Sequence, residues 1–406
     1  MVLTGLRRPL ARGAQAWLAL AAVVSAAAAV ACGGVTAGHG GTPARSRHAR
    51  AAPAAPAAPG SLSAISCIGS SGCMAVGGAF QGVAGDNGTR RIAEWWNGRE
   101  WRLMKPPGSA TAPLNAVSCT AAPGTPGPDC MVVGATALTA AGQAVAERWN
   151  GRAWQLLSPR SPGHQDILTG VSCAGPRFCM AVGIYTPHSG WRFLAQVWNG
   201  VTWRRVKIPT PAGNDLGQLN GVTCLRPAWC MASGGYDPGT GNGLAVTEIW
   251  NGARWRIASA SGLPRATILQ DAACSSASHC VAIGGADDGN HALAAQWNGT
   301  RWTVTGPPAS QSGDSLASVA CASASTCMVV GSRSSAGVAL ELTAGRSWRV
   351  PPAASAQTSY WGLSGISCPG PRDCLAVGYK QDGNDAPDFT LAERWDGRGW
   401  DLVAAP

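Results

Sequence analysis

A unit with two cysteines and a pair of tryptophans recurs through most of this 406-residue chain. Leu168 to Trp203, LTGVSCAGPRFCMAVGIYTPHSGWRFLAQVWNGVTW, is its most regular copy, and seven copies follow one another at a period of about fifty residues. Each copy is predicted to form four short strands, in the order L-x-x-V-S-C, C-M-A-V-G, A-x-x-x-W and x-x-W-x-x. A repeat of this length built only from strands predicts a radially or linearly repeated β architecture.

Seven sheets can close into a ring or stack as an open solenoid. Ring closure is favoured, because neither end of the array carries a polar capping repeat and closure leaves only short, protected edges. We therefore expect an all-β fold, a seven-bladed β-propeller of four-stranded antiparallel blades over 61–406, with the first and last blades packed together. The repeats are expected at 61–107, 113–159, 167–210, 218–260, 268–308, 315–352 and 362–406.

Fourteen of the fifteen cysteines fall two per repeat, and six of the seven pairs have C-x5-C spacing. Such a pair can close the turn between the first two strands of a blade, so we expect one local disulfide per blade. Zinc is the alternative, but a structural zinc site needs four converging ligands and only His279 accompanies a pair. No metal or cofactor is expected. The expected disulfides are Cys67–Cys73, Cys119–Cys130, Cys173–Cys179, Cys224–Cys230, Cys274–Cys280, Cys321–Cys327 and Cys368–Cys374.

Asn-Gly or Asp-Gly separates the last two strands in six copies, and these dipeptides tolerate the positive φ of a type I′ hairpin. A two-residue turn would set Trp154 opposite Glu147 and diagonal to Trp149, whereas a four-residue turn would pair the two tryptophans directly. In either register both rings lie on one face of the sheet. Thirteen of the eighteen tryptophans occupy these positions, and we expect them to pack between neighbouring sheets.

The N-terminal region, residues 1–31, begins with three arginines, continues with an uncharged apolar run and ends in small residues before Cys32. That order is typical of a secretory signal peptide, and the run is shorter than the roughly 20 residues of a membrane span. Cys32 is the one cysteine outside the repeats, and Ala29–Gly33 resembles the lipobox of bacterial lipoproteins, with Ala where that family has Leu. The resemblance implies an exported protein anchored outside the cell membrane by a lipid on Cys32. Ordinary cleavage and secretion is the alternative.

The formal charge of +10 is unevenly divided along the chain. Residues 1–59 hold six of the 31 basic residues and none of the 21 acidic ones, and 32–60 is expected to be a disordered Ala/Pro/Gly-rich linker. The small remaining excess is spread through the repeats and forms no basic stripe in the sequence. We therefore expect no nucleic-acid partner.

The run M-A-V-G-G, a long variable loop, and then E-R-W-N-G-x-x-W resembles a kelch repeat over residues 61–406. The repeats also resemble cysteine-paired repeats of exported actinobacterial proteins. The kelch family implies four-stranded blades and binding through loops on one face of the disc. It lacks this cysteine pair, and the double glycine is complete in only three copies, so the resemblance is architectural.

Strand parity divides the expected blade into two ends. The turns between the first and second strands and between the third and fourth strands lie at one end and are uniform. The long, divergent connections lie at the other end, and loops on a rigid scaffold are where binding residues concentrate. The candidate ligand-binding residues there are His164, Asp166, Tyr185, His188, Trp191, Tyr236, Asp237, Asp287, Asp288, His291, Tyr360, Trp361, Tyr379, Lys380, Asp382 and Asp385.

Aromatic and polar side chains mixed on one face favour a glycan or a protein ligand from the cell envelope. The six histidines do not cluster with a nucleophile motif or a metal-ligand spacing, so no catalytic residue is assigned. The sequence thus predicts a monomeric, non-catalytic binding or adaptor module at the bacterial cell surface. The alternative is a propeller-type enzyme acting on an envelope or extracellular polysaccharide.

Overall fold

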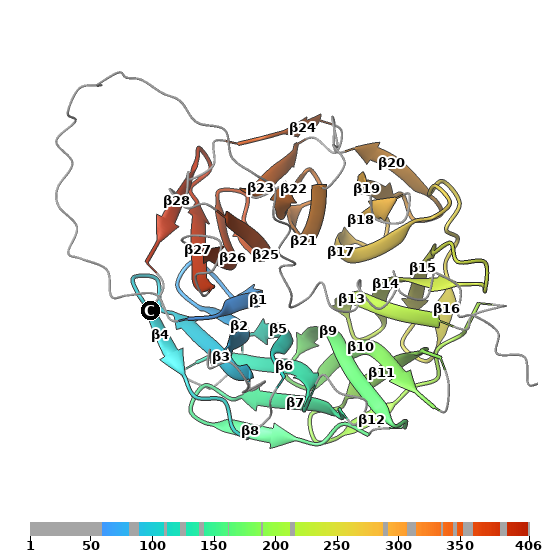
Figure 1. Ribbon diagram of the computed structural model, residues 1–406, viewed down its shortest axis with the longest axis horizontal. Helices are drawn as coiled ribbons and strands as arrows, with labels where there is room; N and C mark the ends of the chain where they lie inside the picture. The colour runs from blue at the N-terminus through green and yellow to red at the C-terminus, as the bar shows by residue number, and fades with distance from the viewer. Residues whose placement is uncertain are drawn as a thin grey trace, which may run out of the picture.

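Seven blades surround a central axis in the computed structural model, which forms a disc (Figure 1). Each blade is an antiparallel sheet of four strands that follow one another in chain order, with the first strand nearest the axis (Figure 1). The all-β, seven-bladed propeller predicted from the repeats is therefore confirmed. The structure describes residues 59–80, 89–108, 112–121, 127–137, 142–160, 162–187, 190–211, 216–286, 291–306, 314–333, 336–343, 347–351, 360–381 and 388–404.

The blades are numbered along the chain. Blades 1 to 4 comprise β1 (Ser61–Cys67), β2 (Cys73–Phe80), β3 (Thr89–Trp96), β4 (Trp101–Met104), β5 (Leu114–Thr120), β6 (Asp129–Ala135), β7 (Ala144–Trp149), β8 (Trp154–Leu157), β9 (Gln165–Gly175), β10 (Phe178–Thr186), β11 (Arg192–Trp198), β12 (Trp203–Arg205), β13 (Leu216–Arg226), β14 (Trp229–Asp237), β15 (Leu244–Trp250) and β16 (Trp255–Ile257). Blades 5 to 7 comprise β17 (Ile268–Ser276), β18 (His279–Ala286), β19 (His291–Trp297), β20 (Trp302–Gly306), β21 (Asp314–Ser323), β22 (Thr326–Arg333), β23 (Ala336–Thr343), β24 (Ser347–Arg349), β25 (Tyr360–Gly370), β26 (Asp373–Gln381), β27 (Phe389–Trp395) and β28 (Trp400–Val403).

Every blade holds its own disulfide, which joins the end of its first strand to the second strand. All seven pairs expected from the sequence are formed, including the wider-spaced Cys119–Cys130. The segment expected to be a signal peptide, Cys32 and the expected linker up to residue 58 lie outside the described residues. Among the described residues, no helix is long and apolar enough to cross a membrane.

The leucine and the glycine that recur in the repeats lie opposite each other. In blade 3, Leu168 of β9 pairs with Gly183 of β10, and Thr169, the next residue, is left out of the ladder as a β-bulge. The same bulge follows the leucine in all seven first strands. It brings the carbonyl of Ile167 against Gly183, where an added Cβ would overlap the oxygen. Close backbone approach therefore explains the glycine.

The tryptophan pairs settle the register of the third and fourth strands. Trp149 lies directly opposite Trp154, so the turn has four residues, and the ring centroids are 5.6 Å apart. Five other blades repeat this pairing at 5.3–5.8 Å. Blade 6 is the exception, because Leu342 takes the place of the first tryptophan opposite Trp348.

The Asn-Gly dipeptides do not form two-residue type I′ turns, and the four-residue alternative is the one observed. In blade 2 only Gly151 has a positive φ, of 87°, whereas a type I′ turn needs positive φ at both central residues. Asn150 instead uses its side-chain Oδ1 to accept the backbone N–H groups of Arg152 and Ala153, at 3.0 and 2.9 Å. Asn supplies this local cap in a turn as readily as it supplies a positive φ.

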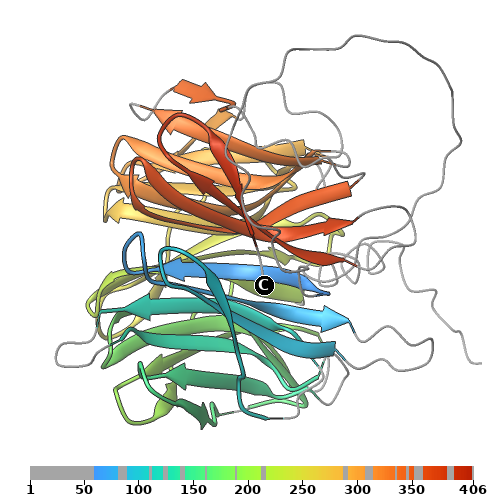
Figure 2. The same ribbon diagram turned by 90° about the vertical axis from the view of Figure 1, so that its left-hand side faces the viewer.

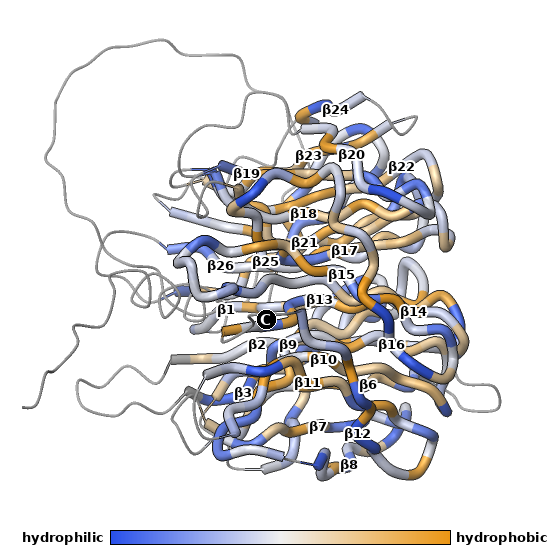
Figure 3. Tube along the Cα trace, turned by 90° about the vertical axis from the view of Figure 1, so that its right-hand side faces the viewer, coloured by the Kyte–Doolittle hydropathy of each residue, from blue (hydrophilic) through white to orange (hydrophobic). Residues whose placement is uncertain are grey.

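The hydrophobic core lies between the blades. Each of seven apolar clusters joins two neighbouring blades, and the tryptophan pair of one blade packs against the blade before it. The inter-sheet role predicted for the tryptophans is thus confirmed. The second strands are nearly all buried, as in β6, and apolar residues follow the strands through the disc (Figure 3).

The ring closes blade against blade, as expected from the repeat frame. Leu62 and Trp96 of blade 1 share one apolar cluster with Leu375 of blade 7. The backbone N–H of Gly60 also donates to the carbonyl of Asp388 at 2.7 Å, just before β27. The first and last blades therefore meet through side-chain packing and a short main-chain link.

Candidate functional site

The two edges of the disc differ in the connections they hold. We call turn face the edge with the hairpin turns that join the first two and the last two strands of each blade, such as 175–178 and 199–202 in blade 3. These two turns contact each other, since an added Cβ on Gly200 would lie 3.1 Å from Cγ of Arg177. The opposite edge, the loop face, holds the longer connections. Figure 2 shows the disc from its side, with the strands running between the two faces.

Blades 2 and 3 are joined by main-chain contacts at the loop face. The backbone N–H of His164 donates to the carbonyl of Thr186 at 2.9 Å, and its carbonyl accepts Nε2 of Gln143 at 3.2 Å. The backbone N–H of Asp166 donates to the carbonyl of Gly142 at 2.9 Å. His164 is exposed, whereas Asp166 is fully buried. The backbone that carries the His164 imidazole is therefore fixed by hydrogen bonds to both blades.

Tyr185 lies at the loop-face end of β10, opposite Asp166 of β9 and Arg192 of β11. Its ring is half-buried against the blade 2–3 core, and the guanidinium carbon of Arg205 lies 4.5 Å from its centroid. This is the geometry of a cation–π contact. Arg205 comes from β12, so the stack ties the inner part of blade 3 to its outermost strand.

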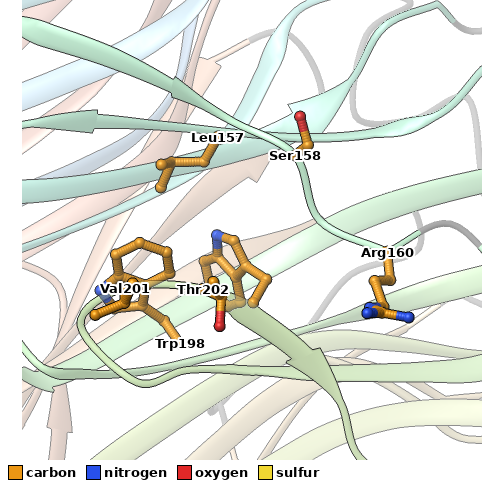
Figure 4. A pocket seen from close by; sticks show the side chains of 7 residues that line it. Leu157, Ser158, Arg160, Trp198, Val201 and Thr202 are labelled. Atoms are coloured by element: carbon orange, nitrogen blue, oxygen red, sulfur yellow. The ribbon is translucent and has the colours of Figure 1, made fainter.

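A pocket of about 340 Å³ opens in the same junction, at the outer strands of the two blades and towards the turn face (Figure 4). Its walls come from the end of β8 and the following connection in blade 2, and from the last hairpin of blade 3. They combine apolar, aromatic, hydroxyl and guanidinium groups. The lining residues are Leu157, Ser158, Arg160, Trp198, Val201, Thr202 and Trp203.

Gln196 holds one wall of this pocket in place. Its fully buried side chain accepts the backbone N–H of Arg160 at 3.1 Å and donates to the carbonyl of the same residue at 2.8 Å. Gln196 lies directly opposite Arg205 in the sheet, so it links the pocket to the Tyr185 stack. The exposed Arg160 side chain therefore projects from a fixed backbone.

On blade 4 the predicted residues support the loop structure. The carbonyl of Trp191 accepts the backbone N–H of Gly217 at 3.1 Å, which joins blade 3 to blade 4. Asp237 is 7% exposed, and its Oδ1 accepts the backbone N–H groups of three following residues at 2.9–3.1 Å. Tyr236 packs against the blade 3–4 core. These groups shape the loop-face surface beside the blade 2–3 junction.

Blade 7 carries a second group of predicted residues. Tyr360, Tyr379 and Lys380 are half-buried at the loop-face ends of β25 and β26, whereas Trp361 is buried beside Gly337 of blade 6. Burial, together with the negative charge of Asp388, raises the pKa of the Tyr379 hydroxyl, and burial also raises the pKa of Asp388. The phenol and the carboxyl thus lie close together at the ring closure.

The structure gathers His164, Asp166 and Tyr185 at one junction and the four predicted residues of β25 and β26 on blade 7. His291 is exposed at the start of β19 on blade 5. His188, Asp287, Asp288, Asp382 and Asp385 lie outside the described residues. Within the described ranges, no group of three or more His, Cys, Asp or Glu residues is placed to hold a metal ion.

Sequence reasoning missed a set of glutamates buried between blades. Burial raises the pKa of both Glu94 and Glu248 to about 8, and neither carboxyl has a hydrogen-bond partner among the described residues. Burial also raises the pKa of Glu147 to about 7, although the paired Arg91 guanidinium opposes the shift. The spacing E-x-W was the available signal, because it puts each glutamate on the same sheet face as a tryptophan that packs against the neighbouring blade.

No protein-family model matches the chain, and no similar sequence is found among curated proteins. Its fold is similar to that of solved propellers. The GH74 xyloglucanase from Xanthomonas campestris matches at a TM-score of 0.57 and 13% identity, over 87% of this chain and 55% of that one. YCF48 from Cyanidioschyzon merolae matches at 0.53 and 15%, over 84% and 97%. YCF48 bound to D1 peptide matches at 0.52 and 12%, over 84% and 93%. At these identities the likeness shows the fold alone.

Proposed function

We propose that this protein is a non-catalytic binding module of the bacterial cell surface, and that it holds a glycan at the junction of blades 2 and 3. The pocket forms its binding surface at the outer strands of this junction, towards the turn-face hairpin 199–202, and His164 and Tyr185 lie at the loop-face end of the same junction. The remaining predicted loop residues, on blades 4, 5 and 7, provide further contacts to a longer ligand. A protein segment is the alternative ligand of the same surface.

The observation that carries the proposal is the pocket whose wall Gln196 holds. Ligand sites are concave, largely preformed and lined by apolar groups with a few placed polar ones, at about 300–1,000 Å³. The pocket is within this range of volume at about 340 Å³, and its exposed lining is more polar than apolar. Because one buried amide holds both the N–H and the carbonyl of Arg160, little backbone freedom is lost when its side chain contacts a ligand.

The mixture of groups favours a sugar. Ser158 and Thr202 offer hydroxyls that both donate and accept hydrogen bonds, and Arg160 donates from a planar fork. Leu157 and Val201 offer apolar surface to the C–H faces of a sugar ring. Val201 is 77% exposed, so this surface is open to a ligand from solution.

The setting we propose is the outside of the cell. Seven disulfides indicate an oxidising compartment. A lipid on Cys32, followed by the linker to residue 60, would attach the propeller to the membrane as a monomer. Labelling with a fatty-acid analogue tests the anchor: an unlabelled mature protein that stays soluble contradicts it.

A glycan array probed with the mature protein tests the function. We expect binding to an envelope glycan, lost in Ser158→Trp because the new ring fills the pocket. Ala404→Trp is the matched control, since Ala404 is the exposed residue at the same position after the last strand of blade 7. Turnover of an oligosaccharide would favour the enzyme alternative. Silence on the array, with a protein captured from wall extract, would favour the protein ligand.

A further inference from the structure

The turn face carries a ring of arginines that the proposed glycan site does not use. Six blades contribute at least one, and all their side chains are exposed. The equivalent turn of blade 6, residues 344–346, lies outside the described residues. The turn arginines, as we name this set, are Arg99, Arg152, Arg177, Arg226, Arg254, Arg301, Arg372 and Arg398.

None of the turn arginines forms an ion pair within the described part of the chain. The acidic residues near the turns are engaged elsewhere: Asp129 pairs with Arg148, and Glu100 pairs with Arg102. Asp396 uses its Oδ1 to accept two backbone N–H groups of its own turn, at 2.7 and 3.0 Å. Besides these hydrogen bonds, the charges of Arg99 and Arg398 help to lower the pKa values of the Glu100 and Asp396 carboxyls, and the other turn arginines leave the turn face with an excess of positive charge.

The fold, not the local sequence, creates this surface. Along the chain the turn arginines are separated by tens of residues and are interleaved with acidic ones. Because all seven blades face the same way around the axis, their hairpin turns come to one edge of the disc. The backbone of the turns that carry these arginines is fixed either by a side-chain cap or by the neighbouring disulfide. In blade 4, for example, Oδ1 of Asn251 accepts the backbone N–H of Arg254 at 2.9 Å, and the Cys224–Cys230 disulfide flanks the other turn.

We propose that the turn face, exposed outside the cell as the proposed function has it, binds a linear envelope polymer, not a nucleic acid, that carries phosphate groups at regular intervals. Arginine forms bidentate hydrogen bonds with phosphate through its planar guanidinium, and the described hairpin turns of this face contain no lysine. Each exposed contact is weak alone, but several along one chain act together through their effective concentration. A ring of separated sites therefore fits an extended polyanion better than a single small anion.

A membrane surface is the competing partner for a basic face. Insertion of protein side chains into a membrane needs a contiguous apolar surface beside the charges, and without one the attraction to anionic headgroups is electrostatic alone. Ile68 and Val201 are exposed, by 42% and 77%, but they lie on the turns of different blades. The turn face thus offers charge without an apolar cluster, which favours a soluble polymer.

Titration with long-chain polyphosphate tests this proposal, with tripolyphosphate and phosphatidylglycerol vesicles as comparison probes. We expect tight binding of the long chain at low salt, weak binding of tripolyphosphate at equal phosphate concentration, and little binding to vesicles. The affinity should fall steeply with salt, because bound phosphates release their counterions. Equal binding of tripolyphosphate, or tighter binding to vesicles, would overturn the proposal.

Two double variants locate the binding surface. Arg226→Gln with Arg254→Gln removes the turn arginines of blade 4, and the slope of log affinity against log salt should fall by roughly 0.7–0.9 per arginine. Arg204→Gln with Arg256→Gln removes the same charge from exposed positions on β12 and β16 and should leave the slope unchanged. An equal loss in both variants would show that only net charge matters. Glycan binding at the blade 2–3 pocket should persist in both, so the two proposals fail separately.

Discussion

The backbone N–H of Cys67 donates to Oγ of Ser367 at 3.0 Å, across 300 residues of sequence. The same bond joins consecutive blades elsewhere, as from Cys119 to Ser66 and from Cys173 to Ser118, each at 2.9 Å. The junction that closes the ring is therefore built like the junctions inside it. The serine of the V-S-C motif serves the next blade around the ring, not its own.

Replacing this serine by alanine should destabilise the junction that closes the ring as much as it destabilises a junction between consecutive blades. Ser367→Ala and Ser118→Ala each leave one backbone N–H without its partner, so we expect each to lower the free energy of unfolding by about 0.5–1.5 kcal/mol. Urea unfolding of the two variants measures this. If Ser118→Ala were costly and Ser367→Ala neutral, the closing junction would not be formed in solution.

The glycine opposite the strand bulge should be intolerant of any side chain. Gly183→Ala forces a methyl group against the carbonyl of Ile167, so we expect a loss of at least about 1–3 kcal/mol. Gly399 has nothing within 4 Å of an added Cβ, and Gly399→Ala is the matched control. Thermal unfolding of both variants checks the contrast, and equal melting temperatures would refute the proposed backbone overlap.

The buried glutamates should make the protein more stable in mild acid. Burial raises the pKa of Glu94 and Glu248 to about 8 from an ordinary 4.5, so the folded state binds more protons than the unfolded chain between those pH values. Stability is then full below pH 4.5 and falls as the pH rises towards 8. We expect a higher melting temperature at pH 5 than at pH 8.

Substitution assigns this pH dependence to particular groups. Glu248→Gln should reduce the difference between pH 5 and pH 8, because the amide has no proton to lose. The exposed Glu100 pairs with Arg102, which lowers its pKa, so Glu100→Gln should leave the difference in place. A pH profile identical in Glu248→Gln and the parent protein would contradict the assignment.

The buried pair of Arg91 and Glu147 should be costly to break from one side. Arg91→Met leaves a fully buried carboxyl without its partner, so we expect a loss of about 3–5 kcal/mol in urea unfolding at neutral pH. The double variant Arg91→Met with Glu147→Leu should recover most of that loss, because no unpaired charge remains. A single variant as stable as the double one would argue against the ion pair.

Much of the fold followed from recurring residues. Two cysteines per repeat predicted each disulfide, and the parity of the Trp149 and Trp154 positions put both rings on the inter-blade face. The turn type did not follow, because Asn-Gly is compatible both with a positive φ and with a side-chain cap, and Asn150 uses the cap. Composition could not choose between two conformations that the same dipeptide permits.

The residues of the candidate site were harder to predict from the sequence than the fold of the blades. Position on a variable loop identified His164 and Tyr185, which lie at the blade 2–3 junction. It equally selected Asp237, whose carboxylate serves its own backbone, because sequence position does not reveal where a carboxylate points. The sequence did not identify Gln196 and Arg160 as site residues, because they belong to different blades and come into contact only in the folded ring.

The affinity of Ser158→Trp for the glycan that binds the parent protein tests the central claim most directly. Calorimetric titration measures the affinity of the parent protein, Ser158→Trp and Ala404→Trp for this glycan. All three proteins must first show the same melting temperature. If the blade 2–3 pocket holds the glycan, Ser158→Trp should bind at least about tenfold more weakly, a loss of about 1.4 kcal/mol, while Ala404→Trp binds like the parent. Equal affinity in all three proteins would contradict the account and place the ligand elsewhere on the propeller.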